Sequence, residues 1–189
     1  MNILDYNALY HITHIDNIST IFKYGLLAHN NKYQIKDISD NQVNSRRNRI
    51  EPIYRKNVHS YVPFYFNPKN AMLYKRKEIQ DDIIILAFEK SLIELNGAIF
   101  TDGNASSCYS TFYKDIVNLN RLDWNCLSDW SWCNHPDGKR TRMAEVLVPS
   151  HVSIDRLQSV ICNSITTYIN LLEVCPSDTE IILEQKFYF

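Results

Sequence analysis

Short apolar segments of strand length recur through both halves of this 189-residue chain, and they constrain its fold more than any other feature. The most complete is Ile83-Ile84-Ile85-Leu86-Ala87-Phe88, which contains no polar side chain. A strand without a polar face has to be covered on both sides, so this segment is predicted to be a central strand of a sheet. Because the helical signals are short and few, the pattern predicts an α+β domain. The other predicted strands lie at residues 9–13, at 61–66, around 145, near 160–162 and near 181–187.

Three helices are predicted from their capping residues. Asp16 is expected to begin the first helix and Gly25 to end it, because an acidic side chain can cap a helix and glycine commonly ends one. Asn67 followed by Pro68 predicts the start of a short second helix. Ser164 is expected to begin a third. The stretch 28–60 has no clear periodicity, and a loop of that length is more often functional than merely connecting.

Composition narrows the class of protein. The length predicts one domain, residues 1–189, with 45% apolar residues available for a core. Only four glycines are present, which argues against glycine-rich phosphate loops. No signal peptide or membrane span is readable, and five irregularly spaced cysteines are typical of reduced thiols, so a cytoplasmic protein without membrane partners is expected.

Three of the predicted strands each contain one polar residue of chemical interest: His11, Tyr65 and Glu145. Each also has an ordinary interpretation. A lone histidine in an apolar strand is commonly a hydrogen-bonded core residue, and a tyrosine among aromatics is commonly core packing. A single glutamate on a strand can simply face solvent on the alternate side. The joint occurrence of all three, together with the sequence around them, favours a functional interpretation.

That surrounding sequence resembles the DarT family along nearly the whole chain. The resemblance lies in YHITHIDNI followed by GLL, in HSYVPFYFNPKNAMLY, in FTDGNA, in LDW and in RMAEVLVP, which occur in the family's order. It implies an ADP-ribosyltransferase-like fold, with a split antiparallel or mixed β-sheet core and short flanking helices. It also implies a toxin that uses NAD to ADP-ribosylate DNA, and a macrodomain antitoxin (DarG-like) that removes the modification.

The resemblance further implies roles for individual residues. Tyr65 would stack on the nicotinamide ring, and Glu145 would stabilise positive charge at the ribose carbon, as in sugar hydrolysis. An essential arginine is implied in Ser45-Arg46-Arg47-Asn48-Arg49, with Arg47 the first choice and Arg46 the second, because a guanidinium can clamp a diphosphate. The remaining NAD-site residues would be His11, Thr13, Asn17 and Met72.

Basic residues predict a polyanionic partner although the formal net charge is only −1. A base can be modified at its edge only when it is unstacked, which favours single-stranded DNA. Nearby aromatics such as Tyr54, Tyr109, Tyr113 and Trp124 are candidates for stacking on unpaired bases. The alternative is ordinary solubilising charge. The residues predicted to contact DNA are Arg46, Arg49, Arg55, Lys56, Lys75 and Arg142.

The expected function is therefore transfer of ADP-ribose from NAD to guanine or thymine in single-stranded DNA, and the strand MAEVLVP is nearer to guanine-modifying relatives. Two alternatives stay open: transfer to RNA or protein, and a nucleic-acid-binding module of the same fold without NAD chemistry. Cys126, Cys133 and His135 lie close in sequence, but their spacing is not that of a zinc site. No metal is predicted.

Overall fold

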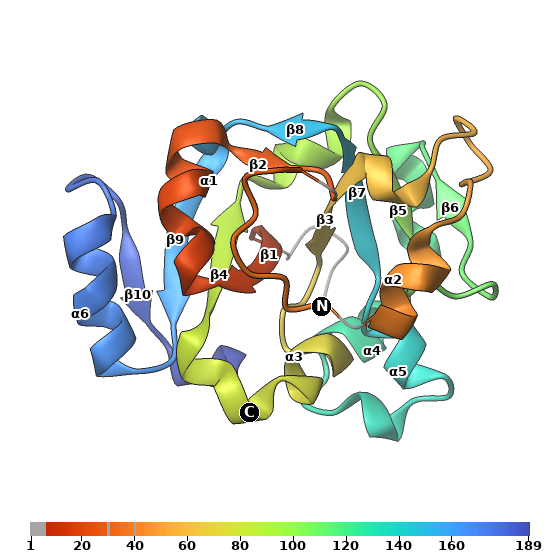
Figure 1. Ribbon diagram of the computed structural model, residues 1–189. Coiled ribbons are helices and arrows are strands. Elements are labelled where there is room, and N and C mark those ends of the chain that lie inside the picture. Colours follow the sequence, from red (N-terminus) through yellow and green to blue (C-terminus); the bar gives the residue numbers. More distant parts are fainter. Residues whose placement is uncertain (1–6, 30, 40) are drawn as a thin grey trace.

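The structure is a computed structural model that describes residues 7–29, 31–39 and 41–189. Residues 1–6, on which the signal-peptide prediction partly rests, lie outside the described residues. One sheet of eight strands, in the order β10-β9-β4-β1-β3-β7-β5-β6, forms the centre of the fold (Figure 1). Its neighbouring strands are antiparallel except for the parallel pair β9 and β10. A mostly antiparallel sheet with short helices confirms the predicted fold class.

The strands and helices of the described residues are short. The strands are β1 (Leu9–His14), β2 (Leu26–Leu27), β3 (Tyr61–Tyr65), β4 (Ile83–Phe88), β5 (Ile99–Thr101), β6 (Phe112–Tyr113), β7 (Glu145–Pro149), β8 (His151–Val152), β9 (Leu157–Cys162) and β10 (Ile181–Leu183). The α-helices are α1 (Ile18–Tyr24), α2 (Asn41–Arg47), α3 (Ala71–Lys75), α4 (Trp124–Ser128), α5 (Gly138–Thr141) and α6 (Ile165–Val174). Strands β2 and β8 pair with each other outside the main sheet.

Strand β4 is buried along its whole length, as its apolar sequence predicts. Its alternate residues enter two different hydrophobic clusters. Ile84, Leu86 and Phe88 pack with α1 and with β9, while Ile83 and Ile85 pack on the opposite face against Met143 and Tyr188. The sheet is therefore covered on both faces, which is why this strand needs no polar side.

The sheet splits between β1 and β3, and this split determines where a ligand can enter. Strand β1 pairs with β4 over six residues, and β3 pairs with β7 over five. Between β1 and β3, by contrast, the register contains the single pair Tyr10 and Tyr65. The two halves of the sheet therefore diverge beyond this point. The side chain of His11 reaches across the gap, with Nδ1 2.9 Å from the Pro63 carbonyl oxygen.

The capping predictions were partly wrong. His14, rather than Asp16, caps the first helical segment, because its ring nitrogen accepts from the Asp16 amide at 3.1 Å. Asn70, rather than Asn67, caps α3, since its side-chain oxygen accepts from the amides of Met72 and Leu73. Ser164 caps α6 as predicted, with its hydroxyl accepting from the Thr167 amide.

Two further segments differ from the prediction made from the sequence. The stretch 28–60 is not structureless, because its second half contains α2, which carries Arg46 and Arg47. The last strand ends at Leu183, and a short 3₁₀ turn replaces the predicted strand to residue 187. Gly25 does end α1, with φ of 73°, and a Cβ there would collide with His151. Within the described ranges, no helix is long and apolar enough to cross a membrane.

Candidate active site

A large cavity of about 1640 Å³ opens where the two halves of the sheet diverge. Strands β1 and β3, helices α2 and α3, and the segments 29–39 and 104–109 contribute residues to its wall. The residues predicted to bind NAD lie here, together with two of those predicted to contact DNA, Arg46 and Lys75, although they come from distant parts of the chain. They are His11, Thr13, Asn17, Arg46, Arg47, Tyr65, Met72 and Lys75.

Glu145 begins β7 and is completely buried. Two contacts fix the backbone of Glu145. It pairs with Tyr65 on the neighbouring strand β3, and its amide donates to the Thr101 hydroxyl at 3.3 Å. Its carboxylate accepts from the Ala105 amide at 2.7 Å. A carboxylate held by a strand and by a backbone amide is rigidly placed, as a catalytic group needs to be.

Arg47 covers this carboxylate. Its Nη1 donates to both oxygens of Glu145, at 3.0 and 2.9 Å, and the Arg47 side chain is only 11% exposed. Burial, the largest single influence, lowers the pKa of the Arg47 guanidinium, but charge interactions with Glu145 and Tyr65 and the hydrogen bonding to Glu145 together raise it above its ordinary value. Arg47 lines the cavity, whereas Glu145 lies behind it. The neighbouring Arg46 is exposed and also lines the cavity, but the contact with Glu145 is made by Arg47, so the geometry favours Arg47 over Arg46 as the arginine of the reacting centre.

The contact of the His11 ring with the Pro63 carbonyl, across the split in the sheet, fixes its tautomer. The Pro63 carbonyl can only accept, so Nδ1 carries the hydrogen and Nε2 is left as an acceptor. Burial lowers the pKa of His11, which the contact with Pro63 only partly offsets, so the ring is neutral near pH 7. A neutral imidazole with a bare nitrogen on a cavity wall can accept a hydrogen bond from a sugar hydroxyl.

Tyr65 lies between these groups. It pairs with Tyr10 on one side and with Glu145 on the other, so it joins the two halves of the sheet at the cavity. Burial and the Glu145 carboxylate raise the pKa of its phenol, which therefore stays uncharged. Met72 packs in the same cluster from α3. A flat ring and a thioether provide an apolar surface for a planar ligand.

Asn17 has a structural task that the sequence did not reveal. Its amide nitrogen donates to the Thr13 hydroxyl at 3.0 Å and to the Lys36 carbonyl at 2.7 Å. Its oxygen accepts from the amides of Ile35 and Lys36 at 2.8 and 2.9 Å. Asn17 thereby fastens the segment 31–39 to β1. A direct contact of Asn17 with NAD stays a prediction, and its observed contacts shape the cavity wall instead.

The predicted DNA-binding residues fall into different environments. Arg46, Arg55, Lys56 and Lys75 are exposed, as phosphate contacts require. Arg49 is half-buried and donates to the Ser107 carbonyl at 2.9 Å, so it supports the segment 104–109 at the cavity. Their role in binding DNA stays a prediction.

Arg142 contradicts its predicted role in DNA binding. Its side chain is 1% exposed, and its guanidinium donates to the carbonyls of Cys126, Asp129 and Lys69. A guanidinium occupied in this way cannot reach a phosphate. Trp124 is likewise buried, with its indole N–H donating to the Leu119 carbonyl at 2.7 Å, so it cannot stack on a base.

Sequence reasoning also missed two partners of Glu145. The segment FTDGNA was noted for its resemblance, but Thr101 and Ala105 were given no role. The signal available in the sequence was the polar turn in FTDGNA, directly after an apolar segment. Which amide of that turn reaches Glu145 depends on the pairing of β5 with β7, which the sequence does not state.

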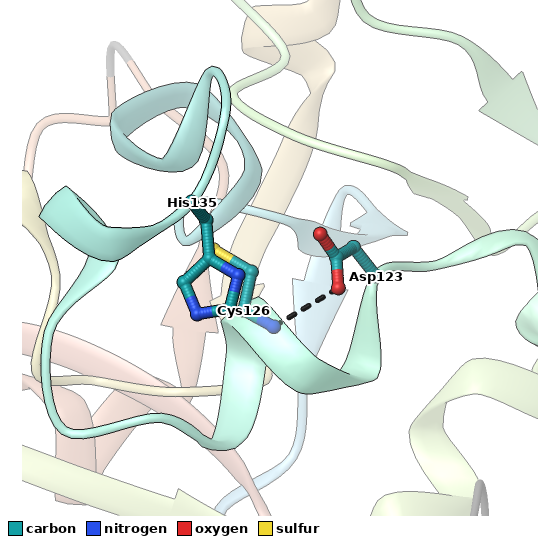
Figure 2. Close-up of side chains that lie close together, drawn as sticks. All are labelled: Asp123, Cys126 and His135. Atoms are coloured by element: carbon teal, nitrogen blue, oxygen red, sulfur yellow. Dashed lines mark hydrogen bonds between the residues drawn. The ribbon is translucent and has the colours of Figure 1, made fainter.

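A second cluster of chemically active side chains lies beside α4. Figure 2 shows Asp123, Cys126 and His135 converging, and their ligand atoms lie within 4.8 Å of one another. Cys133, which the sequence grouped with them, is exposed and does not join the cluster. Each group already has a partner: Asp123 caps α4 through the Cys126 amide at 3.0 Å, and His135 Nε2 lies 2.7 Å from an Asp129 oxygen. Burial raises the pKa of the Cys126 thiol, which works against a metal-binding thiolate.

Comparisons with known proteins identify the family to which the chain belongs. A DNA ADP-ribosyl transferase of Thermus sp. (strain 2.9) is 32% identical over 153 residues, covering 74% of this chain and 73% of that protein. A DNA ADP-ribosyl transferase–DNA ADP-ribosyl glycohydrolase fusion protein of Thermosipho africanus is 27% identical over 194 residues. That match covers 97% of this chain and 50% of the fusion protein.

Solved structures give the same result. The structure of Thermus sp. 2.9 DarT in complex with ADP-ribosylated ssDNA superimposes with a TM-score of 0.89 and 25% identity, covering 98% of this chain and 97% of that one. The same protein in complex with NAD+ gives a TM-score of 0.85, also at 25% identity, and the match covers 98% of each chain. Residues 10–189 match the family described as "ssDNA thymidine ADP-ribosyltransferase, DarT". The family match over residues 10–189, the 32% identity to the Thermus protein and the shared fold show that the chain belongs to the DarT family.

Proposed function

We propose that this protein transfers ADP-ribose from NAD to a base of single-stranded DNA, with Glu145 and Arg47 at the reacting centre. The observation that carries the proposal is the contact of Arg47 with Glu145, next to Tyr65 and His11 and at the wall of one large cavity. As a DarT-family protein, the chain is an NAD-dependent DNA ADP-ribosyltransferase. The roles of individual residues in the reaction are part of the proposal.

The chemistry follows from the groups at the site. The bond between the nicotinamide nitrogen and the ribose C1′ breaks, and its electron pair leaves with neutral nicotinamide. Positive charge develops at C1′, where the Glu145 carboxylate stabilises it. A nitrogen of the base supplies the electron pair of the new bond and loses its proton. Tyr65 offers a flat face to the nicotinamide ring, and His11 accepts a hydrogen bond from the ribose.

Arg47 has to move before this chemistry can occur. In the structure its guanidinium covers Glu145, which is inaccessible from the cavity. A diphosphate is a bidentate acceptor that can draw the guanidinium away from the carboxylate. NAD binding would then uncover Glu145 at the moment when its charge is needed.

The acceptor is tested by incubating the protein with NAD labelled in the adenine ring and with single-stranded DNA, duplex DNA, RNA or protein in separate reactions. We expect label on single-stranded DNA and free nicotinamide in equal amount. Label on RNA or protein alone would overturn the proposed acceptor. Release of nicotinamide without any labelled acceptor would do the same.

The modified base is guanine or thymine. The family description names thymidine, whereas the resemblance of the strand MAEVLVP led us to expect guanine. Oligonucleotides that contain only one of these bases, digested to nucleosides after reaction, separate the two by mass spectrometry. A modified cytosine or adenine would contradict both.

We further propose a partner that reverses the modification and a role as the toxin of such a pair. The Thermosipho relative, whose name joins the transferase to a DNA ADP-ribosyl glycohydrolase, supports this. Expression of the chain alone should arrest growth of a bacterial host, and co-expression of a macrodomain glycohydrolase should restore it. Normal growth with active transferase present would argue against the toxin role.

A further inference from the structure

Four aromatic side chains meet at one edge of the cavity, away from Glu145, and no part of the proposed function uses them. We call them the aromatic rim: Tyr74, Trp130, Trp132 and Phe189. Tyr74 comes from α3, the two tryptophans from the connection between α4 and α5, and Phe189 from the segment after β10. In Figure 1, α3, α4 and α5 lie together along one end of the sheet.

The rim has an ordered geometry. Three rings pack edge to face: the centroids of Tyr74 and Phe189 are 5.1 Å apart, those of Trp132 and Phe189 are 5.6 Å apart, and those of Tyr74 and Trp132 are 6.1 Å apart. Trp130 is nevertheless 79% exposed, and Tyr74 is 49% exposed. Grouped aromatic surface left open to water marks a binding surface, because burying it in the protein would be favourable.

Cations accompany these rings. Lys69 Nζ lies 4.6 Å from the Trp130 ring centroid and 5.1 Å from that of Phe189, and Lys77 Nζ lies 5.6 Å from that of Tyr74. A purely apolar ligand would gain nothing from these charges. A nucleotide has both matching parts, a flat base for the ring and a phosphate for the ammonium group.

The buried side chain of Arg142 holds two segments of the aromatic rim in place. Its guanidinium donates to the carbonyl of Lys69 at 3.3 Å and to that of Asp129, the residue before Trp130, at 2.6 Å. A third hydrogen bond, 2.9 Å long, goes to the Cys126 carbonyl in α4. This buried side chain therefore ties the segment that bears Lys69 to the segment that bears Trp130. It is a positioning residue for the rim.

We propose that the aromatic rim binds a nucleotide that flanks the target base in single-stranded DNA. The flanking base stacks on Trp130, and Lys69 contacts its phosphate. The inference rests on the proposed function, since it assumes that the target base enters the same cavity. It adds a subsite that fixes the register of the strand and so contributes to the choice of sequence around the modified base.

The test combines a protein variant with changes in the DNA. Trp130→Ala, Trp130→Phe and the wild type are assayed on an oligonucleotide that the wild type modifies, and on copies with one abasic site at each position around the target. In the Ala variant we expect kcat/KM for DNA to fall about tenfold or more, mainly through a higher KM, since one stacked base contributes about 1–3 kcal/mol. Trp130→Phe, which keeps a ring, should recover much of the loss. Val117→Ala, which truncates another exposed side chain, outside the cavity, is the matched control.

The abasic series identifies the stacked position. At one flanking position an abasic site should weaken the wild-type reaction about as much as Trp130→Ala does, and the same site should cost the Ala variant nothing further. The inference would be overturned if the loss from an abasic site simply added to the loss from Trp130→Ala at every position, or if Trp130→Ala kept the wild-type KM. The aromatic rim would then be a binding surface for a protein partner instead. The proposed function is judged separately, by whether the wild type modifies the intact oligonucleotide.

Discussion

Glu145 and Arg47 form a buried ion pair at the wall of a cavity, and its value for catalysis differs from its value for stability. Desolvation of both charges offsets much of their attraction, so such a pair contributes little net stability. It is costly to break from one side, however, because the remaining charge is then buried without its partner. An arrangement of this kind is poised to exchange one partner for a charged ligand.

The role of Glu145 can be tested by removing its charge without changing its shape. In Glu145→Gln we expect the transfer rate to fall by about 10²–10³ or more, because a charge that stabilises the transition state is lost. NAD affinity measured by calorimetry should change much less. Glu173→Gln, on the exposed face of α6, serves as the control. Transfer at the wild-type rate would remove Glu145 from the mechanism.

Two neighbouring arginines provide a matched pair for the second test. Arg47→Ala should abolish measurable transfer, because both Glu145 and the diphosphate lose their guanidinium partner. Arg46→Ala, one residue earlier on α2 and exposed, should change the rate only a few-fold. Single-turnover rates at saturating NAD compare the two variants. The reverse order of effects would assign the essential role to Arg46.

The shifted pKa of His11 makes the stability of the folded protein depend on pH in a direction that can be predicted. Burial lowers this pKa below the ordinary value of about 6.5, so below that pH the unfolded chain binds the proton more readily than the folded protein does. Stability is therefore expected to be intact above about pH 6.5 and to be lost progressively as the pH falls towards the folded pKa. Urea unfolding between pH 8 and pH 5 measures this. His11→Gln should flatten the decline only in part, because burial also lowers the pKa of His59.

At the scale of elements, the cavity wall depends on how separate segments are fastened together. The segment 31–39 has no regular secondary structure of its own and is held through the side chain of Asn17. Helix α2 is held in part by His59, whose Nε2 lies 3.0 Å from the Asn44 carbonyl. Such contacts determine where the residues predicted to bind NAD lie.

Asn17 is therefore expected to act through the segment it holds. Asn17→Ala removes all of its contacts with residues 35–36 and with Thr13, and should weaken NAD binding by roughly tenfold while limited proteolysis within 31–39 accelerates. Asn17→Asp keeps the acceptor for the amides of Ile35 and Lys36 and should retain most of the affinity. Equal losses in the two variants would instead point to a direct contact between the Asn17 amide nitrogen and NAD.

At the scale of the whole molecule, a formal net charge of −1 conceals an uneven distribution of basic residues. Arg46 on α2 and Lys75 on α3 are exposed and line the cavity, and Arg55 and Lys56 are exposed on the turn that follows α2. Glu51 in that turn is buried and accepts from the amides of Ile53, Tyr54 and Lys56, whereas Glu78 after α3 is exposed. A polyanionic partner would therefore meet basic side chains along α2 and the turn that follows it.

Salt dependence separates surface contacts from buried structure. Replacing Arg55 and Lys56 by alanine should weaken binding of all single-stranded sequences, and each lost phosphate contact should lower the slope of log K against log salt by about 0.7. Arg142→Met should lower the unfolding free energy by a few kcal/mol, since three carbonyls lose their donor at about 1 kcal/mol or more each. It should reduce the slope by no more than the one phosphate contact of Lys69, whose segment Arg142 holds. A further reduction by Arg142→Met in a Lys69→Ala background would mean that Arg142 itself contacts DNA.

The sequence by itself determined the parts of this protein that depend on local pattern. The apolar run of β4 predicted its central position. Polar residues in the apolar segments that form β1, β3 and β7 predicted His11, Tyr65 and Glu145 as site residues; His11 and Tyr65 line the cavity, and Glu145 lies behind its wall. Capping was less predictable, because His14 and Asn70 replaced the expected Asp16 and Asn67. Several polar side chains stood near each helix start, and packing chose among them.

Only the tertiary structure decided which distant groups meet. Arg47 and Glu145 are 98 residues apart, and they meet because the fold brings the end of α2 to the start of β7. Arg142 looked like one more surface cation, yet it is buried, because three carbonyls from separate segments converge on it. The aromatic rim likewise joins α3 to residues from far along the chain. Local sequence limits the conformation of each segment, but contacts across the fold depend on strand pairing and close packing, to which every segment contributes at once.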